Sequence, residues 1–299
     1  MLLQKIKNSV LKSFSKRSVL KKIATSSQCN TGVVNIHRLD ENNVGDFYCG
    51  PHHYFERINH SLDIFDYKTL DLSSKDNFIN KVCDNSLIIG GGGLLNRSSF
   101  ENQIKLFEAL GQKGKKSVLW GVGHNEKNKK TFGKVTNYNI DISKFGLVGV
   151  RDYNMKAQWV PCVSCMHPIL DTKSSVVNEI GLIFHRKSMT NQTIQKQFKD
   201  FPSISNSSSL ESIIEFISKT DTIVTDSYHA MYWGILMEKK VVVVPISSKF
   251  YSFKYNPIFS SFQNFEKDFK KAERYSGVLE ECRQINRDFS EKVFDYLGY

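Results

Sequence analysis

Short apolar runs alternate with longer amphipathic segments from Thr31 onward, and this alternation constrains the fold more than any other feature of the chain. It is typical of an α/β fold, in which strands and helices alternate around a mostly parallel sheet. The first series predicts strands at 32–36, 62–65, 86–89, 117–120 and 147–150. Helices are expected after Asp46, across 75–83 and across 100–113. We therefore expect these strands to form one doubly wound, Rossmann-like unit.

A second, smaller series follows the polar, serine-rich stretch at 172–178, which has the composition of a linker. It predicts strands at 180–184, 222–225 and 241–244 and helices at 210–218 and 230–237. A final amphipathic segment at 265–287 is expected to cross back over the first half. The expected organisation is a basic amphipathic N-terminal helix at 1–26, a Rossmann-like domain at 27–171, and a second Rossmann-like domain at 172–299 with a closing C-terminal helix.

The composition, with 40% apolar and 24% charged residues among 299, is that of a globular protein. No run reaches the roughly 18 apolar residues of a membrane-spanning helix, and the start of the chain does not have the pattern of a cleaved signal. The six cysteines are scattered apart from one close pair, unlike a disulfide framework. We therefore expect a cytoplasmic protein with reduced thiols.

The net charge of +11 is concentrated at the N-terminus, where eight basic residues precede the first acidic residue, Asp40. Apolar residues recur in this tail at helical spacing, at Leu2, Leu3, Ile6, Val10 and Phe14. This pattern predicts a helix that lies on an anionic membrane surface. The alternatives are that the helix docks on the protein's own body or frays. Because the tail lacks interleaved aromatic residues and any known nucleic-acid module, we expect no nucleic-acid partner.

Ligands of open α/β sheets bind beyond the carboxyl ends of the strands, so residues that follow strands are the first candidates for a site. Asn43 and Asp46 follow the opening strand, in the sequence Asn-Val-Gly-Asp. Asp46 is expected either to accept a hydrogen bond from a substrate hydroxyl or to cap a helix, and Asn43 to contact the substrate. His124 and Asn125 follow a later strand and its Gly-Val-Gly sequence, and they are further candidates for contacts with ligand hydroxyls.

The glycine run Gly90, Gly91, Gly92 and Gly93 follows the strand at 86–89. Consecutive glycines are entropically costly and exceed what an ordinary turn needs, so something must approach this backbone closely. The spacing matches neither a dinucleotide fingerprint nor a phosphate-binding P-loop. We expect a cradle of backbone N–H groups for an anion or a sugar, without nicotinamide or ATP chemistry; a purely structural turn is the alternative.

The stretch Thr225-Asp226-Ser227-Tyr228-His229 lies between a strand and a helix. His229 is the natural general acid or base, because its ordinary pKa lies near physiological pH, and Tyr228 is a candidate for substrate contact. The alternative is an N-cap formed by Asp226 or Ser227 with a structural histidine behind it.

Arginines at the same strand ends could hold an anionic ligand. Arg151 ends the strand at 147–150, and Arg186 follows the strand at 180–184. Cys162, Cys165 and His167 have the spacing of half a zinc site, but no second pair lies nearby in the sequence. We expect a packed turn there and assign no metal site.

Taken in order, the motifs at 43–46, 90–93, 121–123, 148–152 and 226–230 resemble those of the polysaccharide pyruvyl transferase family. The resemblance implies a GT-B-like fold, in which two Rossmann-like domains flank an interdomain cleft. It also implies transfer of a pyruvyl group from phosphoenolpyruvate to sugar hydroxyls of a surface polysaccharide or lipid-linked glycan, with ketal formation and no required cofactor. By the same resemblance, His229 is the acid or base, Arg151 holds the donor, and Asp46 and the glycine run line the cleft.

The sequence departs from the family pattern at Ser227, where many members place an arginine that serves the donor's charge. The anion would then rest on Arg151, Arg186 or the glycine amides. One alternative is a GT-B glycosyltransferase that uses a nucleotide sugar, and another is a non-catalytic scaffold that binds glycans or lipids.

Overall fold

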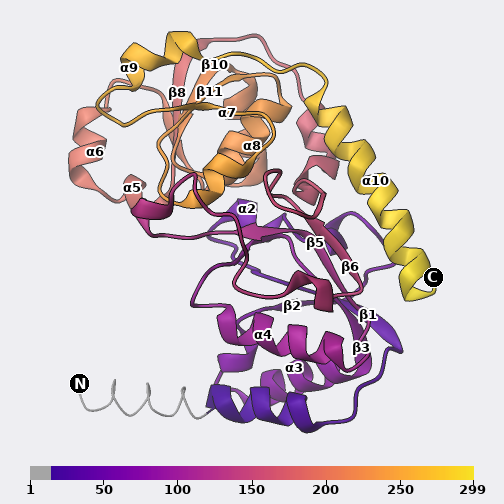
Figure 1. Cartoon of the computed structure of the whole chain (residues 1–299). Helices are drawn as coiled ribbons and strands as arrows, with labels where there is room; N and C mark the ends of the chain where they lie inside the picture. The colour runs from indigo at the N-terminus through magenta and orange to yellow at the C-terminus, as the bar shows by residue number, and fades with distance from the viewer. Residues whose placement is uncertain (1–14) are drawn as a thin grey trace, which may run out of the picture.

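A computed structural model describes residues 15–299, which contain two parallel β-sheets (Figure 1). The strands of the first sheet are β1 (Gly32–His37), β2 (Ser61–Asp63), β3 (Asn85–Ile89), β4 (Gly92–Leu95), β5 (Ser117–His124), β6 (Leu147–Val150) and β7 (Gln158–Trp159). Those of the second sheet are β8 (Asn178–Phe184), β9 (Ser203–Ser205), β10 (Thr220–Thr225), β11 (Lys240–Val243) and β12 (Ile258–Phe259). The prediction of an α/β fold with parallel sheets is confirmed.

Both sheets have the strand order of a doubly wound fold. The first runs β2-β1-β3-β5-β6-β7, with β4 paired to β5, and the second runs β12-β11-β10-β8-β9. In each sheet the chain starts in the interior and later reverses direction, so a topological switch point lies between β1 and β3 and another between β8 and β10. Such switch points are where open α/β sheets bind ligands. All eight predicted strands are present, although the structure has four more.

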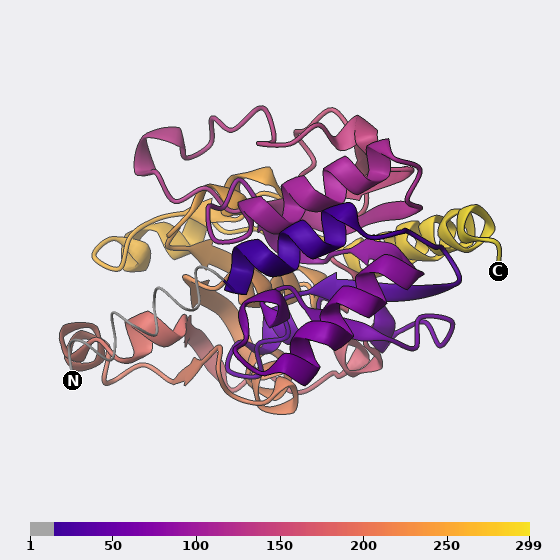
Figure 2. The ribbon, with the colours of Figure 1, turned by 90° about the horizontal axis from the view of Figure 1, so that it is seen from below.

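Alternate side chains of the first sheet pack on opposite layers of helix. One face, which includes Ile36 and Ile89, packs on α3 (Leu72–Asp84), α4 (Glu101–Gln112) and a helix at 15–25. Figure 2 shows that last helix, in indigo, lying between the other two. The opposite face, which includes Ile88 and Trp120, packs on α10 (Val278–Leu297). Coverage of both faces explains the continuous apolar runs, because strands of a parallel sheet are buried on both sides.

The second sheet is covered in the same way. Ile183 and Val243 pack on α7 (Leu210–Ser218) and α8 (Tyr228–Leu236). Leu182 and Val242 pack on the other face, near α6 (Gln192–Gln197) and α9 (Phe265–Asp268). All nine residues of α8 are buried, so this helix is enclosed on every side. The remaining short helices are α2 (Val44–Phe47) and α5 (Arg186–Met189).

Helix α10 begins in the core of the second half, and its later turns cross back and pack on the first sheet, as the sequence predicts for the last amphipathic segment (Figure 1). The indole N–H of Trp120 in β5 donates to Asn286 of α10 at 2.9 Å, and both residues are buried. The helix begins at Val278 rather than at 265, after Gly277 in the left-handed region. The predicted boundary between 171 and 172 falls between β7 and β8, and the division into domains stays a prediction.

The described part of the N-terminal segment packs on the protein. Val19 and Ile23 of the helix at 15–25 are buried in the core of the first sheet. The five residues of the predicted apolar stripe, from Leu2 to Phe14, lie outside the described residues, so the prediction of membrane contact stays open. Among residues 15–299, no helix has both the length and the apolar content to span a membrane.

Candidate active site

A cavity of about 590 Å³ lies where the carboxyl ends of the two sheets meet. In the first sheet its walls come from β4 and from the loops after β1, β2, β4 and β5, and in the second from the loops after β8, β10 and β11. It therefore draws on both topological switch points. The polar and glycine lining residues are Arg38, Asp40, Asn43, Asp46, Gly92, Gly93, Arg97, Ser99, Asn125, Lys127, His185, Arg186, Lys187, Ser188, Asp226 and Lys249.

A larger cavity of about 720 Å³ lies elsewhere, at the ends of α8 and α10. Its lining mixes Asp171, Glu238 and Glu280 with basic side chains, and no loop at the carboxyl end of a strand contributes to it. We therefore place the candidate active site in the smaller cavity.

Asp46 and Asn43 both lie on the cavity wall, as the sequence predicts, but Asp46 does not cap a helix. It sits inside α2, and its carboxylate accepts a hydrogen bond from the Asn43 amide at 2.6 Å. Burial raises the pKa of Asp46 above its usual value, which moves it toward the range useful for proton transfer. The other end of the Asn43 side chain accepts from Asn206 of the second half at 3.0 Å, so the two halves jointly hold this segment.

The glycine run divides between packing and lining. A Cβ on Gly90 would lie 2.2 Å from the Trp120 carbonyl oxygen, and one on Gly91 would lie 2.5 Å from the Cys49 carbonyl oxygen. The Gly90 and Gly91 N–H groups donate to Ile36 and Cys49, so neither is free for a ligand. These two glycines therefore follow the structural alternative. Gly92 and Gly93 line the cavity, where the predicted cradle remains a hypothesis.

Arg151 lies directly behind Gly93. A Cβ on Gly93 would be 3.1 Å from the Arg151 Nη2, so glycine is what allows the guanidinium to approach the wall. The arginine is 1% exposed, and its three guanidinium nitrogens have no hydrogen-bond partner among the described residues. Beside it, the side-chain oxygen of Asn125 is also buried without a partner. The Asp152 carboxylate nearby partly balances the charge of Arg151, but a buried guanidinium without hydrogen-bond partners is still costly, so this arrangement indicates a place prepared for an anion.

Lys249 is the main residue that the sequence analysis did not single out. It follows β11, lines the cavity and lies in the 3₁₀ helix at Ser248–Ser252. Burial lowers the pKa of Lys249 to about 7, with Arg151 and Lys127 acting in the same direction. The only signal in the sequence is a lysine in the loop after a predicted strand, which is too common to be informative.

The cavity is strongly basic. Its lining includes six arginine or lysine side chains and three aspartates. Burial and the nearby cations Arg97 and Lys187 lower the pKa of Lys127 to about 8. Burial and Lys249 lower the pKa of His185 to about 4. Burial is the larger cause of both shifts, but the repulsion among these cations also indicates missing negative charge, which an anionic ligand would supply.

His229 and its neighbours lie behind the wall rather than on it. The His229 ring is 5% exposed and packs so closely on Gly45 that a Cβ there would lie 2.1 Å from Nδ1. Its Nε2 is 3.6 Å from the Cys162 sulfur. Burial, with Arg151 and Lys249 nearby, lowers the pKa of His229 well below its ordinary value, so the ring is neutral. Its predicted catalytic role is not tested by this placement.

Ser227 and Tyr228 are buried with His229 and are absent from the cavity lining. Ser227 precedes α8 without a side-chain capping bond, and Asp226 accepts from the His185 backbone N–H and from Ser188, so neither forms the N-cap that was the alternative. The Tyr228 ring instead supports Arg151, whose guanidinium carbon lies 4.0 Å from the ring centre.

His124 joins the two halves and does not line the cavity. Its Nδ1 is 2.7 Å from the Ser248 hydroxyl and its Nε2 is 2.8 Å from the Ser252 hydroxyl. With the ring 1% exposed and both nitrogens occupied, the structure does not place His124 where it was predicted to contact a ligand. Arg186 does line the cavity, and it forms an ion pair with Asp40 across the two halves at 3.3 Å.

Cys162 and Cys165 form part of a packed turn, as expected. Both are buried in the core of the second half, and His167 is turned to accept the Ile169 N–H at 3.2 Å. Among residues 15–299, these three do not form a group close enough to hold a metal ion.

A model of the polysaccharide pyruvyl transferase family matches residues 49–248, about two thirds of the chain. The matched segment contains the glycine run and Arg151. Asn43 and Asp46 lie just before it, and Lys249 directly follows it. No curated protein matches the chain.

Proposed function

Because the chain belongs to the polysaccharide pyruvyl transferase family, we propose that it transfers the pyruvyl group of phosphoenolpyruvate to a sugar in the cavity between its two sheets. The observation that carries this proposal is Arg151, a buried guanidinium without hydrogen-bond partners behind the wall of a basic cavity. Phosphoenolpyruvate carries a carboxylate and a phosphate, which suit two separate groups of cations.

A GT-B-like arrangement is part of the proposal. Each sheet directs its switch point at the same cavity, so one half can hold the donor while the other holds the acceptor. We place the donor between Arg151, Gly93 and Lys249, because the guanidinium nitrogens of Arg151 lack hydrogen-bond partners and lie beside Gly93. Ser227 is buried and leaves the donor's charge to these groups, which answers the absence of an arginine at that position.

The proposed reaction balances without a cofactor. One sugar hydroxyl adds to C2 of phosphoenolpyruvate, and C3 gains a proton to become a methyl group. A second hydroxyl of the same sugar then attacks C2 and displaces phosphate, which closes the ketal and releases the second proton to the phosphate. Cations around the departing phosphate stabilise the charge that develops on it.

Asp46 and Lys249 are the groups best placed to move these protons. Both line the cavity, and their pKa values are shifted toward neutrality, upward for Asp46 and downward for Lys249. We propose Asp46 as the base for the sugar hydroxyl and Lys249 as the acid. His229 supports Gly45, next to Asp46 in the chain, and would act directly only if its ring reached the cavity.

The acceptor is proposed to be an oligosaccharide or a lipid-linked glycan. A lipid-linked acceptor would be reached at an anionic membrane surface, to which the basic residues near the N-terminus would be attracted. The enzyme would then act at the inner face of the membrane without spanning it.

Phosphate release from phosphoenolpyruvate in the presence of candidate glycan acceptors tests the proposal. Wild-type protein and the exposed control Arg57→Gln should release phosphate, whereas Arg151→Gln and Asp46→Asn should not. If the protein binds the acceptors but releases no phosphate with any of them, the result would instead favour the scaffold hypothesis.

A thermal-shift comparison distinguishes the glycosyltransferase alternative. A ligand that binds the folded state raises Tm, so phosphoenolpyruvate is compared with UDP, GDP and CMP sugars on the same protein. A shift with a nucleotide sugar and none with phosphoenolpyruvate would replace the proposed donor.

A further inference from the structure

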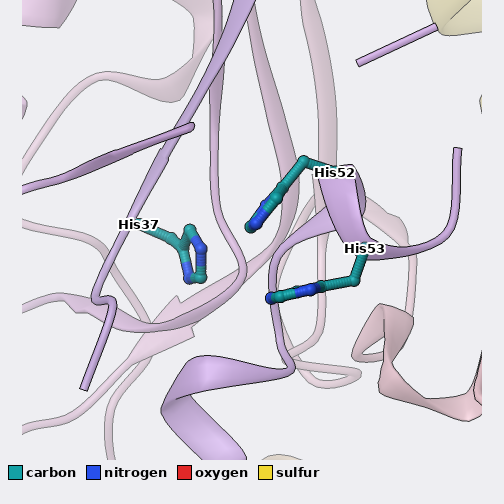
Figure 3. Close-up of side chains that lie close together, drawn as sticks. All are labelled: His37, His52 and His53. Carbon is teal, nitrogen blue, oxygen red and sulfur yellow. The ribbon is translucent and has the colours of Figure 1, made fainter. Parts of the chain in front are cut away.

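Three histidines converge beside the candidate active site (Figure 3). His37 ends β1, and His52 and His53 lie in the 3₁₀ helix at Pro51–His53. Each ring offers one nitrogen such that the three nitrogens lie within 4.8 Å of one another. Among residues 15–299 this is the one group of histidine, cysteine and acidic side chains with that spacing.

One nitrogen of each ring is anchored by an oxygen acceptor. The His52 Nδ1 is 2.9 Å from the Asn35 side-chain oxygen, and the His53 Nε2 is 2.9 Å from the Phe47 carbonyl oxygen. His37 hydrogen-bonds the backbone of Asp46. Metal-binding histidines usually donate their second ring N–H to an oxygen acceptor, which fixes the orientation and the tautomer of the ring.

One ring nitrogen of His37 lacks a hydrogen-bond partner. The His37 ring is fully buried, and its Nε2 has no hydrogen-bond partner among the described residues. Buried polar atoms without partners are rare in folded proteins and call for a missing ligand or water. A Cβ on Gly50 would lie 2.6 Å from this Nε2 and 2.7 Å from the His52 Nδ1, so only glycine leaves the cluster its room.

We propose that His37, His52 and His53 bind a divalent transition metal ion, with zinc as the best fit. Three imidazoles with a water in the fourth position form a common tetrahedral zinc set. Zinc–nitrogen bonds of about 2.0–2.1 Å place the nitrogens of a tetrahedral site about 3.3 Å apart. Binding therefore requires the three rings to close inward, and His52 and His53 are only half-buried, whereas His37 is fully buried.

The ion holds the segment that carries Asp46. His37 belongs to the sheet, whereas His52 and His53 follow α2, so one ion ties α2 to the end of β1. Two of the three anchoring oxygens, those of Asp46 and Phe47, come from α2 itself, and the third belongs to Asn35 of β1. The metal thus positions one wall of the cavity and takes no part in bond making.

Metal content and spectroscopy of the full-length protein test this proposal directly. The chain is stripped with a chelator, dialysed and titrated with Zn²⁺ and, separately, with Co²⁺ as a visible probe. We expect about one equivalent per chain, a tetrahedral Co²⁺ spectrum, and a rise in Tm of about 5 °C at saturating Zn²⁺. The variant His52→Ala/His53→Ala should lose all three signals, while the exposed control His60→Ala should keep them.

Two results would overturn the site. One is the absence of stoichiometric Zn²⁺ and Co²⁺ binding in the wild-type chain. The other is equal binding by the double variant, which would place the ion elsewhere. The double variant leaves the buried His37 in place, and a circular dichroism spectrum of each protein establishes that it is folded before titration. Neither measurement depends on the proposed transferase activity.

Discussion

The guanidinium of Arg151 lies over the Tyr228 ring, with 4.0 Å between its central carbon and the ring centre. Arg151 follows β6 of the first sheet, whereas Tyr228 begins α8 of the second. The cation that we assign to the donor is therefore held by the opposite half of the molecule. This cation–π contact, with the Asp152 carboxylate nearby, supports the guanidinium while its nitrogens have no hydrogen-bond partner among the described residues.

Tyr228→Phe and Tyr228→Leu should differ in their affinity for phosphoenolpyruvate, because only phenylalanine keeps the aromatic face under Arg151. A cation–π contact of this kind contributes about 0.5–2 kcal/mol, so Tyr228→Leu should weaken phosphoenolpyruvate binding by about 2- to 30-fold. Tyr228→Phe should bind within about twofold of the wild type. Calorimetric titration measures both, and equal losses in the two variants would assign the effect to the hydroxyl group instead.

Lys249→Met should make the free protein more stable while it abolishes donor binding. The folded-state pKa of about 7 lies below that of an unfolded lysine, so the unfolded chain binds more protons between pH 7 and about 10.4. Lys249 therefore lowers the free energy of unfolding most at pH 7 and below, and this destabilisation fades as the pH rises toward about 10.4. At pH 7.5 we expect a gain of about 1–2 kcal/mol in the free energy of unfolding, measured by urea denaturation.

The exposed Lys199→Met is the matched control for this substitution. It should change neither the free energy of unfolding nor the response to phosphoenolpyruvate. A less stable Lys249→Met protein would show that Lys249 has a structural partner that the free protein needs.

Donor binding should take up a proton. A bound anion stabilises charged Lys249 and raises its pKa above the value of about 7 in the free protein. Below pH 7 the lysine is already charged, so affinity is flat; above pH 7 affinity should fall, by up to about tenfold per pH unit. Calorimetry at pH 8 in buffers of different ionisation enthalpy measures the proton directly. An affinity unchanged between pH 7 and 9 would exclude Lys249 from the donor site.

The strands were predictable because burial on both faces of a parallel sheet produces continuous apolar runs, as in residues 87–89 and 241–243. The four strands that sequence reasoning missed are short. Two of them, β7 and β12, have two residues each, and β4 begins with glycines, so none carries a usable periodicity. The final helix was misplaced because its charged residues extend the amphipathic pattern back to Phe265, before the break at Gly277.

The site was only partly predictable, because a sequence locates strand ends but not the direction in which a side chain leaves them. Asp46, Asn43, Asn125 and Arg186 do reach the cavity. His229 was predicted to do so, yet it belongs to α8, a helix buried on every side, and its ring packs on Gly45 behind the cavity wall. Lys249 was missed because burial and neighbouring cations, which no local motif encodes, give it its character.

The contact between Gly45 and His229 should appear as strong coupling in a double-mutant cycle. Gly45→Ala places a methyl group about where the His229 ring lies, at 2.1 Å from Nδ1, so it should destabilise the protein by about 1–3 kcal/mol. His229→Ala removes the ring, and in that background Gly45→Ala should be tolerated, with a coupling energy above about 1 kcal/mol. Urea denaturation of the four proteins gives this value. Additive effects would mean that the two residues are apart in solution.

Two N-terminal deletions should distinguish residues that the fold needs from residues that bind a membrane. Val19 and Ile23 are buried in the core of the first sheet, and removal of a side chain of this size from a core costs about 1–5 kcal/mol. A chain that lacks residues 2–25 should therefore lose much of its stability, whereas one that lacks residues 2–13 should keep its Tm.

If the basic, apolar tail binds membranes, the shorter deletion should abolish sedimentation with vesicles that contain anionic lipid. It should leave phosphate release with soluble acceptors intact. Sedimentation equal to that of the full chain would assign membrane contact to another surface, or remove it from the proposed function.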